Sequence, residues 1–427
     1  MSWRDHVRSR TVSAEAAMRT IGPGAFVYLG GNAATPHALV AALARRAVEV
    51  EGITVGHVLM LGGDPFAGNV HVRHRAFFVG TEDRDSVNAG TSDYVPCHLS
   101  EIPAVLAAGP DVDAVLLMVT PPDAHGFVSL GVEVLANLAA ARLARTIILQ
   151  FNPRMPRVHG NAFLHVTDAH AFVEAEEELG QLEVLLASPV ERRIASHIVP
   201  LIPPEATLQL GIGGIPNAVI GLLEGRNDIG VHSEMISDGV MKAVLSGTIT
   251  GRHKTKHSEK VITSFILGTR ALYDWVHDNP GVEAYPSDYT NDIGHASANR
   301  RLVAINSAIS VDLTGQVNSD SIGMSVYSGV GGQVDFIRAA AKSEGGVPII
   351  ALPSTTKKGT ISRIAPFLAE GAGVVTSRAS VRYVVTEHGV ADLWGKSLRE
   401  RAHALIGVAD PVHWDALISA AKLRRLW

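Results

Sequence analysis

The sequence is poor in cysteine and in aromatic residues. Among its 427 residues there is one cysteine, Cys97, and aromatic side chains make up 5%. A single cysteine excludes an intrachain disulfide, and the low count fits a reducing compartment. Cys97 lies among apolar neighbours in TSDYVPCHLSE, so it is interpreted as a buried, unreactive thiol and not as a nucleophile.

Long hydrophobic runs and an excess of positive charge are also missing. No uninterrupted apolar run reaches about 18 residues, the length that a membrane-spanning helix needs. Residues 1–21 carry charges in every turn and have no apolar core of the kind found in secretory signals. These absences predict a cytoplasmic protein. The formal net charge of −5 argues against nucleic acid as a partner.

Metal-binding motifs are absent although the chain contains 19 histidines. His71 and His74 have no adjacent acidic or cysteine partner, and lysines surround His253 and His257. No H-E-x-x-H motif is present. The sequence therefore predicts no metal site.

What the chain does contain is a succession of apolar runs of strand length. Most are continuous and not alternating, which is typical of parallel strands that are covered on both faces. Stretches with helical patterns separate many of them, at residues 36–48, 217–224 and 333–341. This alternation predicts an open α/β sheet. The expected strands lie at residues 25–29, 52–61, 76–79, 114–119, 146–150, 207–210, 261–267, 302–305, 347–352 and 381–385.

The second half of the chain repeats features of the first. Residues 25–43 and 206–223 both read as a strand, a Gly-rich turn, a proline near a helix start and an apolar helix. Further along, FFVGT in the first half matches FILGT in the second, and an SDY tripeptide occurs in both halves. The two members of each matching pair lie roughly 180–195 residues apart. The shared order indicates two copies of one α/β unit.

The boundary between the copies is predicted within residues 174–189. An acidic run, EAEEELGQLE, is followed there by SPVERRIASHIV, which reads as the start of a new helix. A chain of 427 residues exceeds what one core usually supports. We therefore expect an N-terminal domain at residues 1–185 and a C-terminal domain at residues 186–427.

Three glycines, Gly211, Gly213 and Gly214, lie between a predicted strand and a predicted helix. Glycine at such a turn lets a ligand approach the backbone, and the helix N-terminus offers free N–H groups to an anion. The spacing is G-x-G-G and not G-x-G-x-x-G, which disfavours a nicotinamide site. A tight turn that binds nothing remains the alternative.

Glu234 lies in GVHSEMISDGV, some twenty residues after these glycines. A carboxylate in this short polar segment could be a nucleophile, a base, a metal ligand or a helix cap, and spacing does not separate these roles. The neighbouring serine, Ser233, is not part of a G-x-S-x-G elbow. A serine hydrolase is therefore disfavoured.

Two further segments are candidates for binding groups. Gly331 and Gly332 directly precede a predicted helix and could form a nest of backbone N–H groups for an oxyanion. The loop that contains Lys357, Lys358 and Arg363 is basic and rich in hydroxyl groups, so it could hold a phosphate. A plain helix start and a solvated loop are the respective alternatives.

Nine segments in fixed order resemble one known family. They are SDYVPCHLSEIP, VTPPDAHGFVSLGVE, NPRMPRVHG, LGIGGIPNAV, HSEMISDGV, AINSAISVDLTGQVNSDSIG, GVGGQVDFIR, KKGTISRIAP and TEHGVADLWGKSLRERA. Together they span almost the whole chain. The chain resembles the acetyl-CoA hydrolase/transferase family, in the branch that includes 4-hydroxybutyrate CoA-transferase.

The resemblance implies a fold of two similar open α/β domains of the CoA-transferase type, with the active site in the cleft between them. It implies that Glu234 is the catalytic nucleophile, and that Gly331 and Gly332 assist catalysis. The residues that it implies for CoA binding are Gly211, Gly213, Gly214, Asn217, Asn306, Gln333 and Lys358.

The implied activity is transfer of CoA between an acyl-CoA and a free short-chain carboxylate. The reaction would be ping-pong, through an acyl-glutamyl anhydride and a glutamyl-CoA thioester. The acids include 4-hydroxybutyrate, butyrate, acetate, and dicarboxylates such as succinate or itaconate. Coenzyme A is expected as a co-substrate, with no permanently bound cofactor, and the protein is expected to be a homo-oligomer. The alternatives are an acyl-CoA hydrolase on the same scaffold and, more remotely, a non-catalytic CoA-binding protein.

One segment departs from the family pattern. The family's ending resembles E-Y-G-V-A followed by L-R-G-K, whereas this chain has His388 in place of the tyrosine and Trp394 in place of the arginine. If these two residues line the acyl pocket, the acid differs from the usual short fatty acids. If they are structural, the acid is unaffected.

Overall fold

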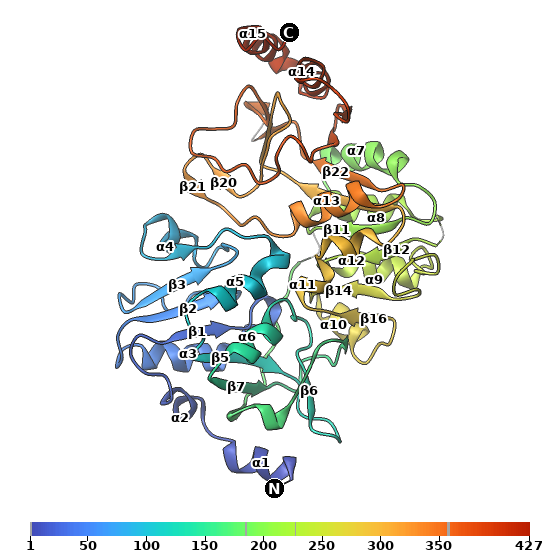
Figure 1. The fold of residues 1–427 in the computed structure, drawn as a ribbon. Coiled ribbons are helices and arrows are strands. Elements are labelled where there is room, and N and C mark those ends of the chain that lie inside the picture. The colour runs from blue at the N-terminus through green and yellow to red at the C-terminus, as the bar shows by residue number, and fades with distance from the viewer. Residues whose placement is uncertain (1, 184–185, 227, 357–358) are drawn as a thin grey trace. The chain divides into compact units, whose positions relative to one another are not determined.

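The computed structural model describes residues 2–183, 186–226, 228–356 and 359–427 (Figure 1). The chain forms two compact units. The first unit joins Met1–Glu183 to Ile262–Thr290, and the second joins Val184–Val261 to Asn291–Trp427. These units differ from the expected domains in the segment Ile262–Thr290, and the boundary at residue 185 stays a prediction.

The first unit is built on a parallel sheet with the strand order β10-β7-β5-β1-β2-β3-β4. Its central strands β1 and β5 are buried along their whole length, as continuous apolar runs require. Figure 1 labels β3, β2, β1, β5 and β7 of this sheet. The seven strands are β1 (Phe26–Leu29), β2 (Ile53–His57), β3 (Val72–Ala76), β4 (Asp93–Tyr94), β5 (Ala114–Val119), β7 (Thr146–Phe151) and β10 (Ala171–Glu174).

The helix α3 (His37–Arg46) follows β1 and buries its apolar face in the core beside that strand, through residues such as Leu39 and Leu43. The other helices of this unit are α1 (Trp3–Arg10), α2 (Ala14–Met18), α4 (Arg84–Asn88), α5 (Ile102–Ala108), α6 (Asn137–Leu143), α10 (Arg270–Val276) and α11 (Ser287–Thr290), with short 3-10 turns η1 (Asn32–Ala34), η2 (Leu99–Glu101) and η3 (Val166–Asp168). Its remaining strands are β6 (Phe127–Ser129), β8 (His159–Gly160), β9 (Phe163–His165), β15 (Phe265–Ile266) and β16 (Val282–Ala284). β14 (Val261–Thr263) spans the sequence boundary between the units.

In the second unit the strands run in the order β27-β26-β22-β17-β11-β12, all parallel except the edge strand β27. They are β11 (Thr207–Leu210), β12 (Gly230–His232), β17 (Leu302–Ser307), β22 (Val347–Ala351), β26 (Tyr383–Thr386) and β27 (Gly389–Asp392). The short strands are β13 (Met235–Ile236), β18 (Ser310–Asp312), β19 (Val317–Asn318), β20 (Ser321–Ile322), β21 (Ser325–Val326), β23 (Thr355–Thr356), β24 (Ile361–Ser362) and β25 (Ile364–Ala365).

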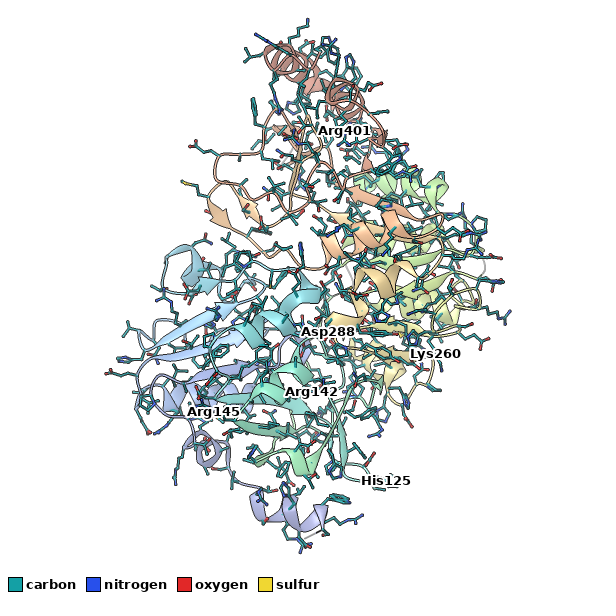
Figure 2. The ribbon with its side chains drawn as sticks, viewed as in Figure 1. His125, Arg142, Arg145, Lys260, Asp288 and Arg401 are labelled. Carbon is teal, nitrogen blue, oxygen red and sulfur yellow. The ribbon has the colours of Figure 1, made fainter. Side chains whose placement is uncertain are left out.

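Helices cover this second sheet, and α13 packs against β17 and β22. The helices are α7 (Pro189–Ile198), α8 (Gly214–Leu222), α9 (Asp238–Leu245), α12 (Ile293–Ser297), α13 (Gln333–Lys342), α14 (Leu398–Gly407) and α15 (Trp414–Leu423), with 3-10 turns η4 (Val199–Leu201) and η6 (Pro411–His413). Arg401 on α14 donates to the carbonyl oxygens of Thr314 at 3.3 Å and Arg378 at 2.7 Å, which ties α14 to the rest of the unit (Figure 2). In the described ranges, no helix is long and apolar enough to cross a membrane.

The two sheets confirm that the chain contains a repeated α/β unit. β1 lies between β2 and β5, and β11 lies between β12 and β17, so each Gly-rich turn follows a central strand whose neighbours correspond. The strand expected at residues 76–79 is wrong, because β3 ends at Ala76. The two SDY segments match in sequence but differ in structure, since the second lies in α11 whereas Asp93 and Tyr94 of the first form β4. Such short segments take their structure from their surroundings, which differ between the copies.

Candidate active site

The backbone that carries Glu234 is fixed from two directions within the second unit. Glu234 lies two residues after the end of β12. The hydroxyl of the intervening Ser233 donates to the carbonyl oxygen of Leu210 at 3.0 Å and accepts from its N–H at 3.3 Å. The Lys254 ammonium donates to the carbonyl oxygen of Val231 at 2.8 Å. Lys254 is buried. These contacts hold the end of β12 in one position.

The Glu234 carboxylate lies against the start of α13 and beside an amide side chain. Its Oε2 accepts from Nδ2 of Asn291 at 3.1 Å. A Cβ atom placed on Gly332 would lie well under 3.0 Å from both Oε2 of Glu234 and Nδ2 of Asn291. Only glycine therefore fits at residue 332, because any side chain would displace the carboxylate.

Burial changes the ionisation of Glu234. The side chain is partly exposed, yet loss of hydration raises its pKa from 4.5 to about 7. The hydrogen bond from Asn291 lowers the pKa, and the negative charge of Asp335 raises it. A carboxylate nucleophile must be ionised to attack, so activity that depends on Glu234 should rise as the pH passes through about 7.

Gly331 and Gly332 precede the first residue of α13, and Gly332 lies against this carboxylate. Gly331 has φ +60° and Gly332 has φ −92°, an alternation that turns successive amides toward one side. Gly332 is the N-cap of α13, and the first N–H groups of a helix have no partner within the helix. The arrangement suits an oxyanion that forms on or beside Glu234, as the sequence predicted, and the catalytic role itself stays a prediction.

The Gly-rich turn between β11 and α8 divides into two kinds of glycine. At Gly211 and Gly213 no described atom lies within 4 Å of where a Cβ would stand, and Gly213 has φ +128°, which disfavours other residues. At Gly214 a Cβ would instead clash with the carboxylate of Glu191. Gly214 is therefore explained by packing, whereas the first two glycines leave open space that a ligand could use.

The other residues predicted to bind CoA have different surroundings in the structure. Asn217 lies in α8 beside the start of α9, where its Oδ1 would meet a Cβ on Gly239 at 3.2 Å. Asn306, at the end of β17, donates through Nδ2 to Oε1 of Gln209 at 2.9 Å and is buried. Lys358 lies outside the described residues. Their binding roles stay predictions.

Gln333 is held by three contacts within the protein. Its Nε2 donates to the carbonyl oxygen of Ser307 at 2.7 Å, and its Oε1 accepts from Ser319 at 3.0 Å and Thr376 at 2.9 Å. These bonds anchor the N-terminus of α13. Its backbone N–H, in the first turn of that helix, is the group better suited to a ligand.

Sequence reasoning missed two residues of this site, Asn291 and Asp335. Asp335 lies in the quoted segment GVGGQVDFIR, and its Oδ2 is 3.4 Å from Nδ2 of Asn291. Of the two residues that depart from the family pattern, Trp394 is 64% exposed and so lies on the surface of the second unit. His388 has its Nε2 3.8 Å from a carboxylate oxygen of Asp410.

The comparison with family models decides the family. Residues 3–183 match the N-terminal domain of the acetyl-CoA hydrolase/transferase family, and residues 268–421 match its C-terminal domain. The chain belongs to the acetyl-CoA hydrolase/transferase family. It is 44% identical to 4-hydroxybutyrate coenzyme A transferase of Clostridium kluyveri, over 99% of this chain and 100% of that protein.

Solved structures agree with this family. The crystal structure of RipA from Yersinia pestis superposes with a TM-score of 0.94 at 34% identity, covering 100% of both chains. That of 4-hydroxybutyrate CoA-transferase from Porphyromonas gingivalis superposes with a TM-score of 0.84 at 38% identity, again over 100% of both. The predictions of a two-domain α/β fold and of an enzyme of the CoA-transferase class are confirmed.

Proposed function

We propose that this protein moves CoA between an acyl-CoA and a free short-chain carboxylate, with Glu234 as the covalent nucleophile. One observation carries the proposal. The partly exposed Glu234 carboxylate accepts from Asn291 and lies against Gly332 at the N-terminus of α13. A carboxylate in this position has hydrogen-bond donors beside it for the negative charge that each step creates.

The chemistry needs no net proton transfer. A Glu234 oxygen attacks the thioester carbonyl carbon, the C–S bond breaks, and an acyl-glutamyl anhydride and CoA thiolate form. The thiolate then attacks the glutamyl carbonyl of the anhydride, which releases the first acid as its carboxylate and leaves a glutamyl-CoA thioester. An acceptor carboxylate repeats the two steps in reverse, so that acyl-CoA leaves and the Glu234 carboxylate returns.

The surrounding groups lower the barriers of these steps. Each tetrahedral intermediate carries an oxyanion, and one well-placed donor such as the Asn291 amide or an amide at the start of α13 contributes about 3 kcal/mol. The open turn at Gly211 and Gly213 is proposed to take the CoA chain. We propose CoA as a co-substrate with no resident cofactor.

The acids are proposed from the relatives. The Clostridium kluyveri and Porphyromonas gingivalis proteins are named for 4-hydroxybutyrate, so we propose 4-hydroxybutyrate with butyrate or acetate as the exchanged pair. Dicarboxylates such as succinate and itaconate are the other acids to compare in a panel. A cytoplasmic location and a homo-oligomeric assembly stay predictions.

Steady-state kinetics test the proposal. With the acyl-CoA and the acid both varied, double-reciprocal plots should be parallel, because the first product leaves before the second substrate reacts. CoA release should be slow in the absence of an acceptor acid, and Glu234→Gln should abolish transfer. Rapid release of free CoA that ignores added acid would instead establish an acyl-CoA hydrolase.

A further inference from the structure

Two carboxylates share one amide nitrogen in the second unit. Nδ2 of Asn291 lies 3.1 Å from Oε2 of Glu234 and 3.4 Å from Oδ2 of Asp335. We propose that Asp335 is a positioning residue, which holds the Asn291 side chain in the orientation that donates to Glu234. This inference rests on the proposed function of Glu234.

The need for such a residue follows from the amide itself. An asparagine amide can turn by half a rotation, which would bring its oxygen toward Glu234 in place of its nitrogen. Oδ1 of Asn291 is buried and has no hydrogen-bond partner among the described residues, so nothing described there holds the oxygen end. The nitrogen end has two acceptors. These acceptors are the carboxylates of Glu234 and Asp335. If the amide rotated, its oxygen would face both carboxylates, and this repulsion disfavours the rotated orientation.

The position of Asp335 in α13 makes it a rigid support. It lies in the first turn of the helix, three residues after Gly332, and its side chain is buried. A helix N-terminus stabilises negative charge, which keeps an acid favourable at this position. The same turn thus supplies the backbone that lies against Glu234 and the acid that orients its hydrogen-bond donor.

Two other titratable residues lie near Glu234 in the sequence, His232 and Asp238, and both remain in every variant below. His232 on β12 has its Nδ1 3.4 Å from Nδ2 of Asn299, and its ring meets the edge of Phe336. Asp238 is buried at the start of α9. The Asp335 variants keep both His232 and Asp238, so a difference in rate between variants can be assigned to residue 335.

A double-mutant cycle tests whether Asp335 acts through Asn291. Asp335→Asn keeps the shape but replaces one acceptor with a donor, so kcat should fall about tenfold to 100-fold with KM for acyl-CoA little changed. In an Asn291→Ala background the same change should cost less than about threefold. Asp335→Glu, which keeps an acceptor, should restore part of the rate. Equal losses with and without Asn291 would overturn the proposal.

Controls separate positioning from stability and from the proposed function. Asp415→Asn removes an acid from the first turn of another helix, α15, and should leave kcat unchanged. If Asp335→Asn is poorly folded, the cycle is measured with Asp335→Glu, and additive losses overturn the proposal there as well. If the Glu234→Gln variant still transferred CoA, the proposed function would be wrong. If that variant were inactive but the losses caused by the Asp335 and Asn291 changes were additive, only the proposed role of Asp335 would be wrong.

Discussion

The ends of β1 and β11 are equivalent points of the two repeats, and their glycines are there for different reasons. After β1, a Cβ on Gly31 would lie well under 3.0 Å from the carbonyl oxygen of Leu59, so the turn is closed by neighbouring backbone. After β11, Gly211 and Gly213 face open space. One motif therefore serves packing in the first unit and leaves room for a ligand in the second.

A glutamate with a raised pKa in each unit sharpens the comparison. Glu133 and Glu234 both accept from an asparagine amide, Asn137 and Asn291 respectively. Glu133 is fully buried, and burial raises its pKa to about 8. Glu234 is partly exposed and has a pKa of about 7. Burial raises the pKa of both carboxyl groups and both have an amide donor, so accessibility, and not the raised pKa, distinguishes the candidate nucleophile.

The largest expected effect separates the two glutamates. Glu234→Gln removes the nucleophile and should lower kcat by about 10⁴-fold or more. Glu133→Gln replaces a carboxyl that is largely protonated at neutral pH, so activity should stay within about threefold of the unmodified protein. Initial rates of CoA transfer at pH 7 measure both. Equal losses would show that the comparison misidentifies the catalytic unit.

The next effect concerns the glycine that lies against Glu234. Gly332→Ala should lower kcat about 100-fold, because the new methyl group displaces the carboxylate from its donors. Gly407→Ala is the matched control, since Gly407 lies in α14 with open space around its Cβ position. A Gly332→Ala protein of normal rate would contradict the geometry of the site.

The two Gly-rich turns should respond to alanine in opposite ways. Gly31→Ala forces a shift of the backbone near Leu59 and should lower the free energy of unfolding by about 1–3 kcal/mol. Gly211→Ala should leave stability within about 0.5 kcal/mol and raise KM for acyl-CoA. Denaturant unfolding and initial rates on both variants check this. If Gly31→Ala kept its stability and Gly211→Ala lost stability, the assignment of packing to the first turn and of open space to the second would be wrong.

The last expected effect is a change in stability with pH, and no change in activity is required to detect it. The pKa of Glu234 is higher in the folded protein than its ordinary 4.5, so the folded state binds the proton more tightly. Its favourable contribution is therefore present below pH 4.5 and is lost as the pH rises through about 7. Glu234→Gln should be more stable than the unmodified protein by on the order of 2 kcal/mol at pH 8, and by little at pH 5. Unfolding at both pH values measures this difference.

The features of the fold and of the site that the sequence predicted are those that depend on residues close together in the chain. Continuous apolar runs predicted strands such as β5 and β11 because both faces of a central strand are buried. The run at residues 76–79 misled because β3, with the sequence VRHRA, carries charged residues although it pairs with strands on both sides, and it ends where the apolar run begins. Gly332 was predicted from the glycine pair that precedes a helix. The role of Glu234 was implied only by the resemblance of nine ordered segments to one family, because its own segment left several roles open.

Asn291 and Asp335 could not be predicted in the same way. Asn291 contacts Glu234 across 57 positions and Asp335 across 44. No local pattern marks a contact of that separation, because it is created only when the ends of β12 and the start of α13 come together in the folded unit. The residues that support a nucleophile were thus visible only in three dimensions.

The most direct measurement is the mass of the peptide that contains Glu234 after incubation with acyl-CoA. The protein is quenched in acid, digested and examined by mass spectrometry, with and without borohydride. The account predicts a CoA thioester on Glu234, which borohydride reduces to an alcohol with loss of activity. An unmodified Glu234 in a protein that still transfers CoA, or an adduct on another carboxylate such as Glu133, would contradict it.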